Sequence, residues 1–164
     1  MDQLRKRSRG LARPPVSKGA GLIDQAQRLL EAIELQEKAF EQYQAGREFI
    51  GQAPNDGEAN WNIGFYLCHF RRDWEEGLPF LAKGGRTGVR DTSRQELDAG
   101  QSPLPDEKKT IADMWWKLEA DASLTIQERE LAKSRATILY REVMPQLTDP
   151  LDRAIVARRL ADAE

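Results

Sequence analysis

Two segments of the chain repeat one helical-hairpin pattern, and this repetition limits the folds that are open to it. The first copy covers residues 63–67 and 74–81, and the second covers residues 111–115 and 140–147. In each copy an apolar residue precedes a small one on the first helix, and the second helix has an aromatic residue followed by a Leu-Pro-x-Leu or Met-Pro-x-Leu segment. Such repetition indicates stacked helix pairs, which commonly present a groove to another protein.

The two copies are unequally spaced, because the second hairpin carries 18 more residues than the first. Two copies are also fewer than the three or so repeats that a solenoid needs to bury a continuous core, so flanking helices must close both ends. No window alternates between apolar and polar residues with a period of two, which argues against strands. We therefore predict an all-α fold of stacked antiparallel helical hairpins, with six or seven helices and a long N-terminal helix.

Small residues in the first copy predict where its two helices approach each other. Gly64 and Gly77 would form a close crossing, so that Gly77→Leu should overpack it and destabilise the fold by ~1–3 kcal/mol. A proline inside a helix removes a backbone hydrogen bond, so the helix from Trp74 should be kinked by Pro79 or end early. The residues expected to have structural roles are Gly64, Gly77, Pro79, Pro145, Trp74 and Trp115.

Residues 1–20 are expected to be a disordered basic tail, and residues 21–164 a single helical-repeat domain. Apolar residues recur at alternating spacings of four and three from Leu22 to Ile50, which predicts a long helix. Two interpretations of this helix stay open. It is either a dimerising coiled coil, in which Gln36 fixes the register, or a helix packed against its own domain.

Capping residues and prolines place the other helices. Asn55 or Asp56 should begin a helix that ends near Arg71, and Thr125 with Glu128 has the spacing of a capping box. Asp149 is followed by proline at the first helical position. The remaining expectations are a loop from 84 to 105 broken by one short helix at 93–99, and helices at 106–122, from 126 to about 147, and from 150 to about 163.

The sequence predicts neither an enzyme nor a metal or cofactor site. The sole histidine, His69, adjoins the sole cysteine, Cys68, but neighbours on a helix point about 100° apart. We expect a buried thiol beside a surface imidazole. A zinc site needs about four ligands, and only these two residues are of N or S type. The glycine-rich segment 84–88 lacks the Lys-Ser/Thr ending of a P-loop.

A protein partner is therefore the expected ligand. Trp115 and Trp116 are neighbours, so one should pack and the other should lie nearer the surface, and Trp61 is offset from the apolar face of its helix. Exposed aromatic side chains are common anchors of interfaces. The candidate partner-binding residues are Trp61, Trp116, Tyr66 and Tyr140.

Charge gives an alternative function. Residues 1–20 carry a net charge of +5, whereas the whole chain carries −2. The tail could bind nucleic acid or an acidic surface, although the acidic remainder makes nucleic-acid binding by the folded part unfavourable. No apolar run reaches the ~20 residues that span a bilayer, and no signal-peptide pattern is present, so the chain as written is expected to be cytoplasmic.

Several segments of the sequence resemble helical regions of known proteins. The placement of Gly64, Gly77 and Phe80 resembles the tetratricopeptide class. The segments 55–60, 73–84 and 112–118, within about residues 50–160, are similar to a helical spacer region of large multidomain planctomycete proteins. This resemblance implies a non-catalytic module that is part of, or related to, a larger and often exported protein. Ala112 stands where that family usually has glycine, and the basic tail stands where it has an export signal.

Overall fold

The computed structural model describes residues 17–101 and 103–163, and this part of the chain is helical without any strand. The expected basic tail lies mostly outside the described residues, but its last four residues belong to the first helix. That helix, α1, spans Ser17–Phe49 and is followed by α2 at Gly57–Phe65 and α3 at Trp74–Leu81. The bounds of three later helices agree with the prediction within a few residues. These helices are α5 at Pro105–Glu119, α6 at Ile126–Val143 and α7 at Pro150–Ala161. The all-α class is therefore confirmed.

The chain divides into two compact units, with the boundary between Glu37 and Lys38. The first unit contains the N-terminal part of α1. The second unit contains the end of α1 and all later helices, and it holds the buried core. Between residues 21 and 37 no side chain is buried.

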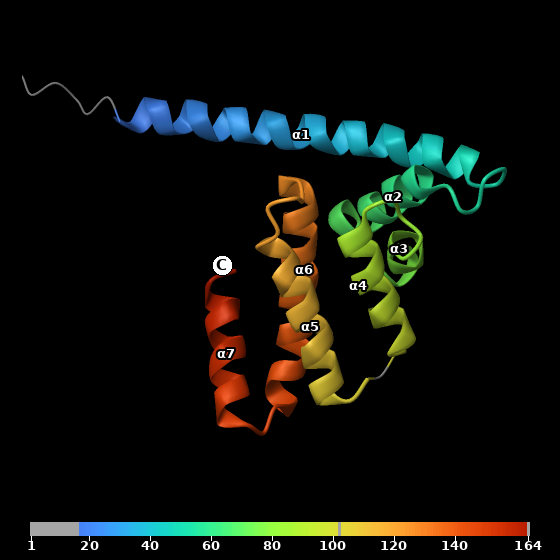
Figure 1. The fold of residues 1–164 in the computed structure, drawn as a ribbon. Helices are drawn as coiled ribbons and strands as arrows, with labels where there is room; N and C mark the ends of the chain where they lie inside the picture. Colours follow the sequence, from blue (N-terminus) through green and yellow to red (C-terminus); the bar gives the residue numbers. More distant parts are fainter. Residues whose placement is uncertain (1–16, 102, 164) are drawn as a thin grey trace, which may run out of the picture. The chain divides into compact units, whose positions relative to one another are not determined.

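Two antiparallel hairpins form at the positions of the two sequence copies. The first packs α2 and the turn after it against α3, and the second packs α5 against α6, where the two helices pack most extensively. Figure 1 shows α5, α6 and α7 running side by side, and α6 also contacts α7. Pro145 lies in a 3₁₀ turn, Met144–Gln146, that follows α6, while α3 ends two residues after Pro79. Stacking of the tetratricopeptide kind remains a prediction.

A twelve-residue helix, α4 at Thr87–Asp98, lies where a loop with a short helix was expected. It packs on α3 and on α5, and so connects the two hairpins. Its buried residues are Val89, Thr92, Ser93 and Glu96, which follow helical spacing although only one is apolar. The prediction was wrong here because the buried side of α4 is mostly polar. Thr92 and Ser93 lie inside it, where the expected short helix was to begin.

The helix expected to run to Arg71 changes its hydrogen bonding before that point. A π-helical turn spans Tyr66–Phe70, and the Arg71 amide donates to the Tyr66 carbonyl at 3.2 Å. Such a turn holds one extra residue. The chain then reverses through Arg72, which has a positive φ of 58°. The Asp73 carboxylate accepts a hydrogen bond from the Glu76 amide and begins α3 as predicted.

Both glycines of the first hairpin lie at close approaches of its helices, but they do not face each other. A Cβ atom on Gly64 would lie 2.8 Å from the Leu81 nitrogen, and one on Gly77 would overlap the Cys68 sulfur and lie 3.0 Å from the Leu67 Cβ. The predicted pairing of Gly64 with Gly77 is therefore corrected. Gly64 faces Leu81, which lies one helical turn after Gly77, and Gly77 faces Cys68, which lies one helical turn after Gly64.

Gly77→Ala tests this packing. We expect it to lower the free energy of unfolding by ~1–3 kcal/mol, because backbone and Cβ atoms of the facing turn must move to admit a methyl group. Urea denaturation with circular dichroism measures the change. Gly51→Ala is the matched control, since a Cβ there meets nothing within 4 Å. Equal stability of the two variants would contradict the close approach.

Candidate functional site

The N-terminal part of α1 exposes a continuous apolar surface. Leu22 is 68% exposed, Leu29 is 62% exposed and Ile33 is 44% exposed. At about 100° per residue these side chains fall within roughly one third of the helix circumference. We call this surface the α1 stripe, and it consists of Leu22, Ile23, Ala26, Leu29, Leu30 and Ile33.

Unlike the α1 stripe, the end of α1 packs against α2. Ala39 and Gly46 are buried seven residues apart, and a Cβ atom on Gly46 would lie 3.1 Å from the Ala59 carbonyl oxygen of α2. They occupy a different heptad position from Leu22 and Leu29. The apolar repeat predicted from Leu22 to Ile50 therefore does not coincide with the buried side of the end of α1, where Phe40 of the repeat is 41% exposed. Packing against the domain is therefore observed for the end of the helix, within the second unit.

Three of the four candidate partner-binding aromatics are buried, so the offset of Trp61 from the apolar face of its helix does not expose it. Trp61 is only 7% exposed, because its ring stacks on Phe65 and the Arg86 guanidinium lies 5.4 Å from its ring centroid. Tyr66 packs at 4.8 Å from the Tyr43 ring, and Tyr140 is fully buried. These residues belong to the core.

Trp116 is the candidate that keeps partial exposure, while its neighbour Trp115 is fully buried, as the adjacency predicted. Two cations lie near the Trp116 ring, Lys133 at 6.0 Å and Arg159 at 5.8 Å from its centroid. Cations at this distance are attracted to the ring. This indole is therefore held in place by its own chain, and a partner would contact only its remaining surface.

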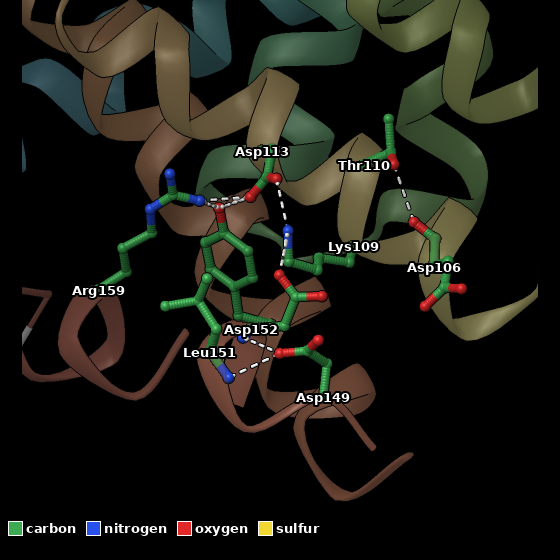
Figure 2. A network of polar contacts seen from close by, with 9 residues as sticks. Asp106, Lys109, Thr110, Asp113, Asp149, Leu151, Asp152 and Arg159 are labelled. Carbon is green, nitrogen blue, oxygen red and sulfur yellow. Dashed lines mark hydrogen bonds and ion pairs between the residues drawn. The ribbon is translucent and has the colours of Figure 1, made fainter. Parts of the chain in front are cut away.

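A polar network joins α7 to the second hairpin. Figure 2 shows Asp113 between Arg159 and Lys109, with Lys109 also facing Asp152. Asp113 accepts a hydrogen bond from the Tyr140 hydroxyl at 2.6 Å and from Lys109 at 3.0 Å, and it forms an ion pair with Arg159. Lys109 reaches Asp152 of α7 at 3.1 Å. The charges are paired and half-buried, which suits a structural connection between helices.

The titration of this network also argues for a structural role. Burial raises the pKa of Asp113, but the hydrogen bonds from Tyr140 and Lys109 outweigh it and hold that pKa below its ordinary value of 3.8. Burial and the hydrogen bond to Asp113 raise the pKa of Tyr140, so the hydroxyl stays protonated as a donor. A tyrosine of this kind is a poor general base at neutral pH.

The lowered pKa of Asp113 predicts a pH dependence. A carboxylate with a folded-state pKa below its unfolded value stabilises the fold above the unfolded value, and this contribution is lost as pH falls through the folded value. We therefore expect wild-type stability to drop below about pH 4. Asp113→Asn should cost about 1–3 kcal/mol at pH 7, because Arg159 and Lys109 lose their shared partner. The stability of Asp113→Asn should also fall less between pH 7 and pH 3 than the stability of the wild-type chain, because residue 113 no longer titrates. Thermal melts at pH 3–7 test both, with the exposed Asp98→Asn as control.

A pocket of about 390 Å³ lies among α3, α4, α5 and α6. Glu96 and Arg135 form an ion pair in its wall, where Arg135 Nε donates to Glu96 Oε1 at 2.9 Å. The indole nitrogen of the buried Trp115 donates to Glu96 Oε2 at 2.7 Å. Arg135 also lies over the Trp74 ring, 4.7 Å from its centroid. A buried carboxylate is therefore held by two donors from two other helices.

Sequence reasoning did not predict this pocket. Glu96 lies on a helix that was mostly expected to be a loop, and Arg135 is 39 residues away from it. The available signal was the spacing of Val89, Ser93 and Glu96 at four and three residues, which places a carboxylate on a buried helical side. Trp74 and Trp115 were expected to be structural, and both are buried against each other at 5.9 Å.

The Cys68 and His69 side chains do not form a reactive pair. Burial raises the pKa of the Cys68 thiol, so that the thiolate is disfavoured. His69 is half-buried between the Phe65 and Phe70 rings instead of lying on the surface, and burial lowers its pKa. In the part of the chain that the structure describes, no three His, Cys, Asp or Glu side chains are grouped to hold a metal ion.

Comparisons with known proteins found no match: no family model, no curated protein and no solved structure is significantly similar to this chain. Among the described helices, none combines the length and the apolar character needed to cross a membrane.

Proposed function

We propose that this chain is a non-catalytic protein-interaction module, and that its α1 stripe pairs with the α1 stripe of a second copy. The observation that supports the proposal is the exposure of the stripe, with five large aliphatic side chains on one side of one helix. A contiguous apolar surface of this kind usually marks an interaction site. A spacer or scaffold role, as the planctomycete resemblance implies, is compatible with such pairing.

Helix stability gives a second argument for a partner. A single helix without tertiary contacts is marginally stable in water, because most helical stability in proteins comes from packing of an apolar side. Within its own unit, the part of α1 from residue 21 to residue 37 buries no side chain. Pairing of two stripes would supply the missing packing and would bury the leucines and isoleucines of both copies.

The expected affinity is modest. Full burial of one leucine or isoleucine contributes ~1.5–3 kcal/mol, so the ten large side chains of two partly exposed stripes contribute on the order of 10 kcal/mol. Association costs an estimated ~4–15 kcal/mol in lost freedom. At the lower end of this cost about 6 kcal/mol remain, which corresponds to a reversible dimer with a dissociation constant on the order of 10–100 µM.

Charge favours a second copy in antiparallel orientation. Glu31, Glu34, Glu37 and Glu41 make the later part of the helix acidic, whereas residues 1–20 carry a net charge of +5. In a parallel pair the four glutamates of one copy would lie beside those of the other. An antiparallel pair directs the basic N-terminal sequence of one copy toward the acidic part of its partner. Opposite charges beside an apolar contact set its orientation.

Co-purification tests the proposal. Two copies with different affinity tags are mixed at about 100 µM, near the expected dissociation constant. Capture of the first tag should retain the second copy, and an excess of untagged chain should displace it. If the second copy is not retained while circular dichroism shows both to be folded, self-association is wrong.

A further inference from the structure

A groove of about 490 Å³ lies along α6, between the turn that contains Arg72 and the end of α7. It shares no lining residue with the pocket around Glu96, and it does not involve the α1 stripe. The α6 residues that line it, from Glu130 to Arg141, recur at spacings of three and four and so lie on one side of the helix. The polar and charged residues of the lining are Arg72, Glu130, Lys133, Ser134, Thr137 and Arg141.

Positive charge predominates in this groove, although the domain as a whole is acidic. Three cations and one carboxylate, Glu130, give the lining a formal charge of +2. Residues 21–164 carry −7, which is the whole-chain charge of −2 less the +5 of residues 1–20. Glu130 and Arg141 lie about 16 Å apart along the helix axis. The carboxylate is therefore at one end of the groove, and the stretch from Ser134 to Arg141 is its positive end.

Two guanidinium groups of the groove have no carboxylate partner. Neither Arg72 nor Arg141 forms an ion pair with another residue in the described part of the chain. Lys133, in contrast, pairs with Glu119 at 3.5 Å and donates to the Asp162 carbonyl at 3.0 Å. A guanidinium presents its donors in a planar fork that fits oxyanions. Arg72 and Arg141 are therefore the cations that are available to an anion.

The turn after the π-helical segment holds the Arg72 side chain against α6. Arg72 has a φ of 58°, a conformation that is uncommon for residues other than Gly, Asn and Asp. Its Nη1 donates to the Ser134 hydroxyl at 2.6 Å, and this hydroxyl keeps its own proton for another acceptor. Arg141 lies two turns after Ser134, about 10 Å along the axis, and helical side chains lean toward the N-terminus of their helix. Both guanidinium groups therefore border the positive end of the groove.

We propose that the positive end of this groove binds a doubly charged oxyanion of the phosphate class, held by Arg72, Arg141 and the Ser134 hydroxyl. Two unpaired guanidinium groups match two negative charges, and hydrogen bonds between ionised groups are stronger than neutral ones. The groove is larger than a phosphate ion, so the phosphate group can be free or carried by a peptide. Both arginines are exposed, so we expect weak, salt-dependent binding with a dissociation constant on the order of 1–10 mM.

Titration of the full chain with sodium phosphate at constant ionic strength, followed by ¹H–¹⁵N NMR, tests the site. At about pH 7.5 a phosphate group carries close to two negative charges. The backbone amide resonances of Arg72 and Ser134 should move and reach saturation. Acetate, which carries one charge, should bind at least about fivefold more weakly. An acetylated and amidated pentapeptide with a central phosphoserine separates the two sources: tighter binding than inorganic phosphate indicates a peptide, and equal or weaker binding indicates free phosphate.

A matched pair of variants tests the role of Arg72. Arg72→Asn removes the guanidinium and keeps a residue that tolerates a positive φ. Arg71→Asn removes the preceding charge, which does not line the groove. Arg72→Asn should weaken phosphate binding at least about fivefold, and Arg71→Asn should weaken it less than about twofold.

Arg141→Gln should also weaken phosphate binding at least about fivefold, and it decides the question if Arg72→Asn does not fold. Resonances of Arg72 and Ser134 that do not move at about 50 mM phosphate would overturn the proposal. Equal weakening by Arg71→Asn and Arg72→Asn would also overturn it, because the net charge of the chain and not the groove would then control binding.

Discussion

Leu29→Lys is expected to weaken self-association of the chain about 100-fold. Leu29 lies in the middle of the α1 stripe and is 62% exposed in the single chain, so both copies lose its burial when the dimer forms. A loss of roughly 3 kcal/mol over the two copies corresponds to about 100-fold in the dissociation constant. Lysine is a good helix former, so α1 itself should persist. Sedimentation velocity over a concentration series measures the change.

Gln27→Lys is the matched control for this prediction. It adds the same charge to the same helix, two residues away, but outside the α1 stripe. We expect it to dimerise as the wild-type chain does. If both variants weaken association equally, net charge and not the stripe controls it, and the proposed pairing of stripes is wrong.

Arg135→Met is expected to destabilise the fold by ~3–5 kcal/mol. Glu96 is buried, and Arg135 is the cation that pairs with it, so the variant leaves a carboxylate without its counter-charge. Methionine keeps much of the length and apolar volume of the arginine stem. The free energy of unfolding, measured by urea denaturation at pH 7, should show the loss.

The double variant Glu96→Met/Arg135→Met separates the lost pair from lost packing. Replacing both charges by apolar residues removes the uncompensated carboxylate, so most of the stability should return. Arg90→Met serves as a control, because Arg90 pairs with the exposed Asp91 and should contribute less than about 1 kcal/mol. A double variant as unstable as Arg135→Met would show that packing around Trp74 and not charge dominates.

The sequence predicted helix starts well because capping is local. Asp56 accepts from the Ala59 amide at 2.8 Å, and Thr125 and Glu128 form the reciprocal capping box that their spacing predicted. Asp149 likewise caps α7 through the Leu151 amide. Each of these interactions joins residues two or three positions apart, so the sequence alone shows them.

Burial was harder to predict where it depends on distant residues. Trp61 is offset from the apolar side of α2, but Arg86, which comes 25 residues later, covers its ring. Helix α4 was missed over most of its length because the polar residues on its buried side find partners elsewhere, as Glu96 does in Arg135 and Trp115. Apolar periodicity does not reveal a helix that buries paired polar groups.

Helices were predicted correctly at the positions of both sequence copies, but the register between the two helices of the first copy was not. Gly64 and Gly77 both mark close approaches, but each faces the opposite helix one turn from the other glycine. Sequence spacing alone does not fix which residues face each other across a hairpin.

Sedimentation equilibrium of the wild-type full chain tests self-association through α1 most directly. At about 200 µM, above the expected dissociation constant, the apparent mass should approach twice the 18.7 kDa of one chain and should fall toward 18.7 kDa on dilution. A mass of 18.7 kDa at every concentration would contradict the proposed function.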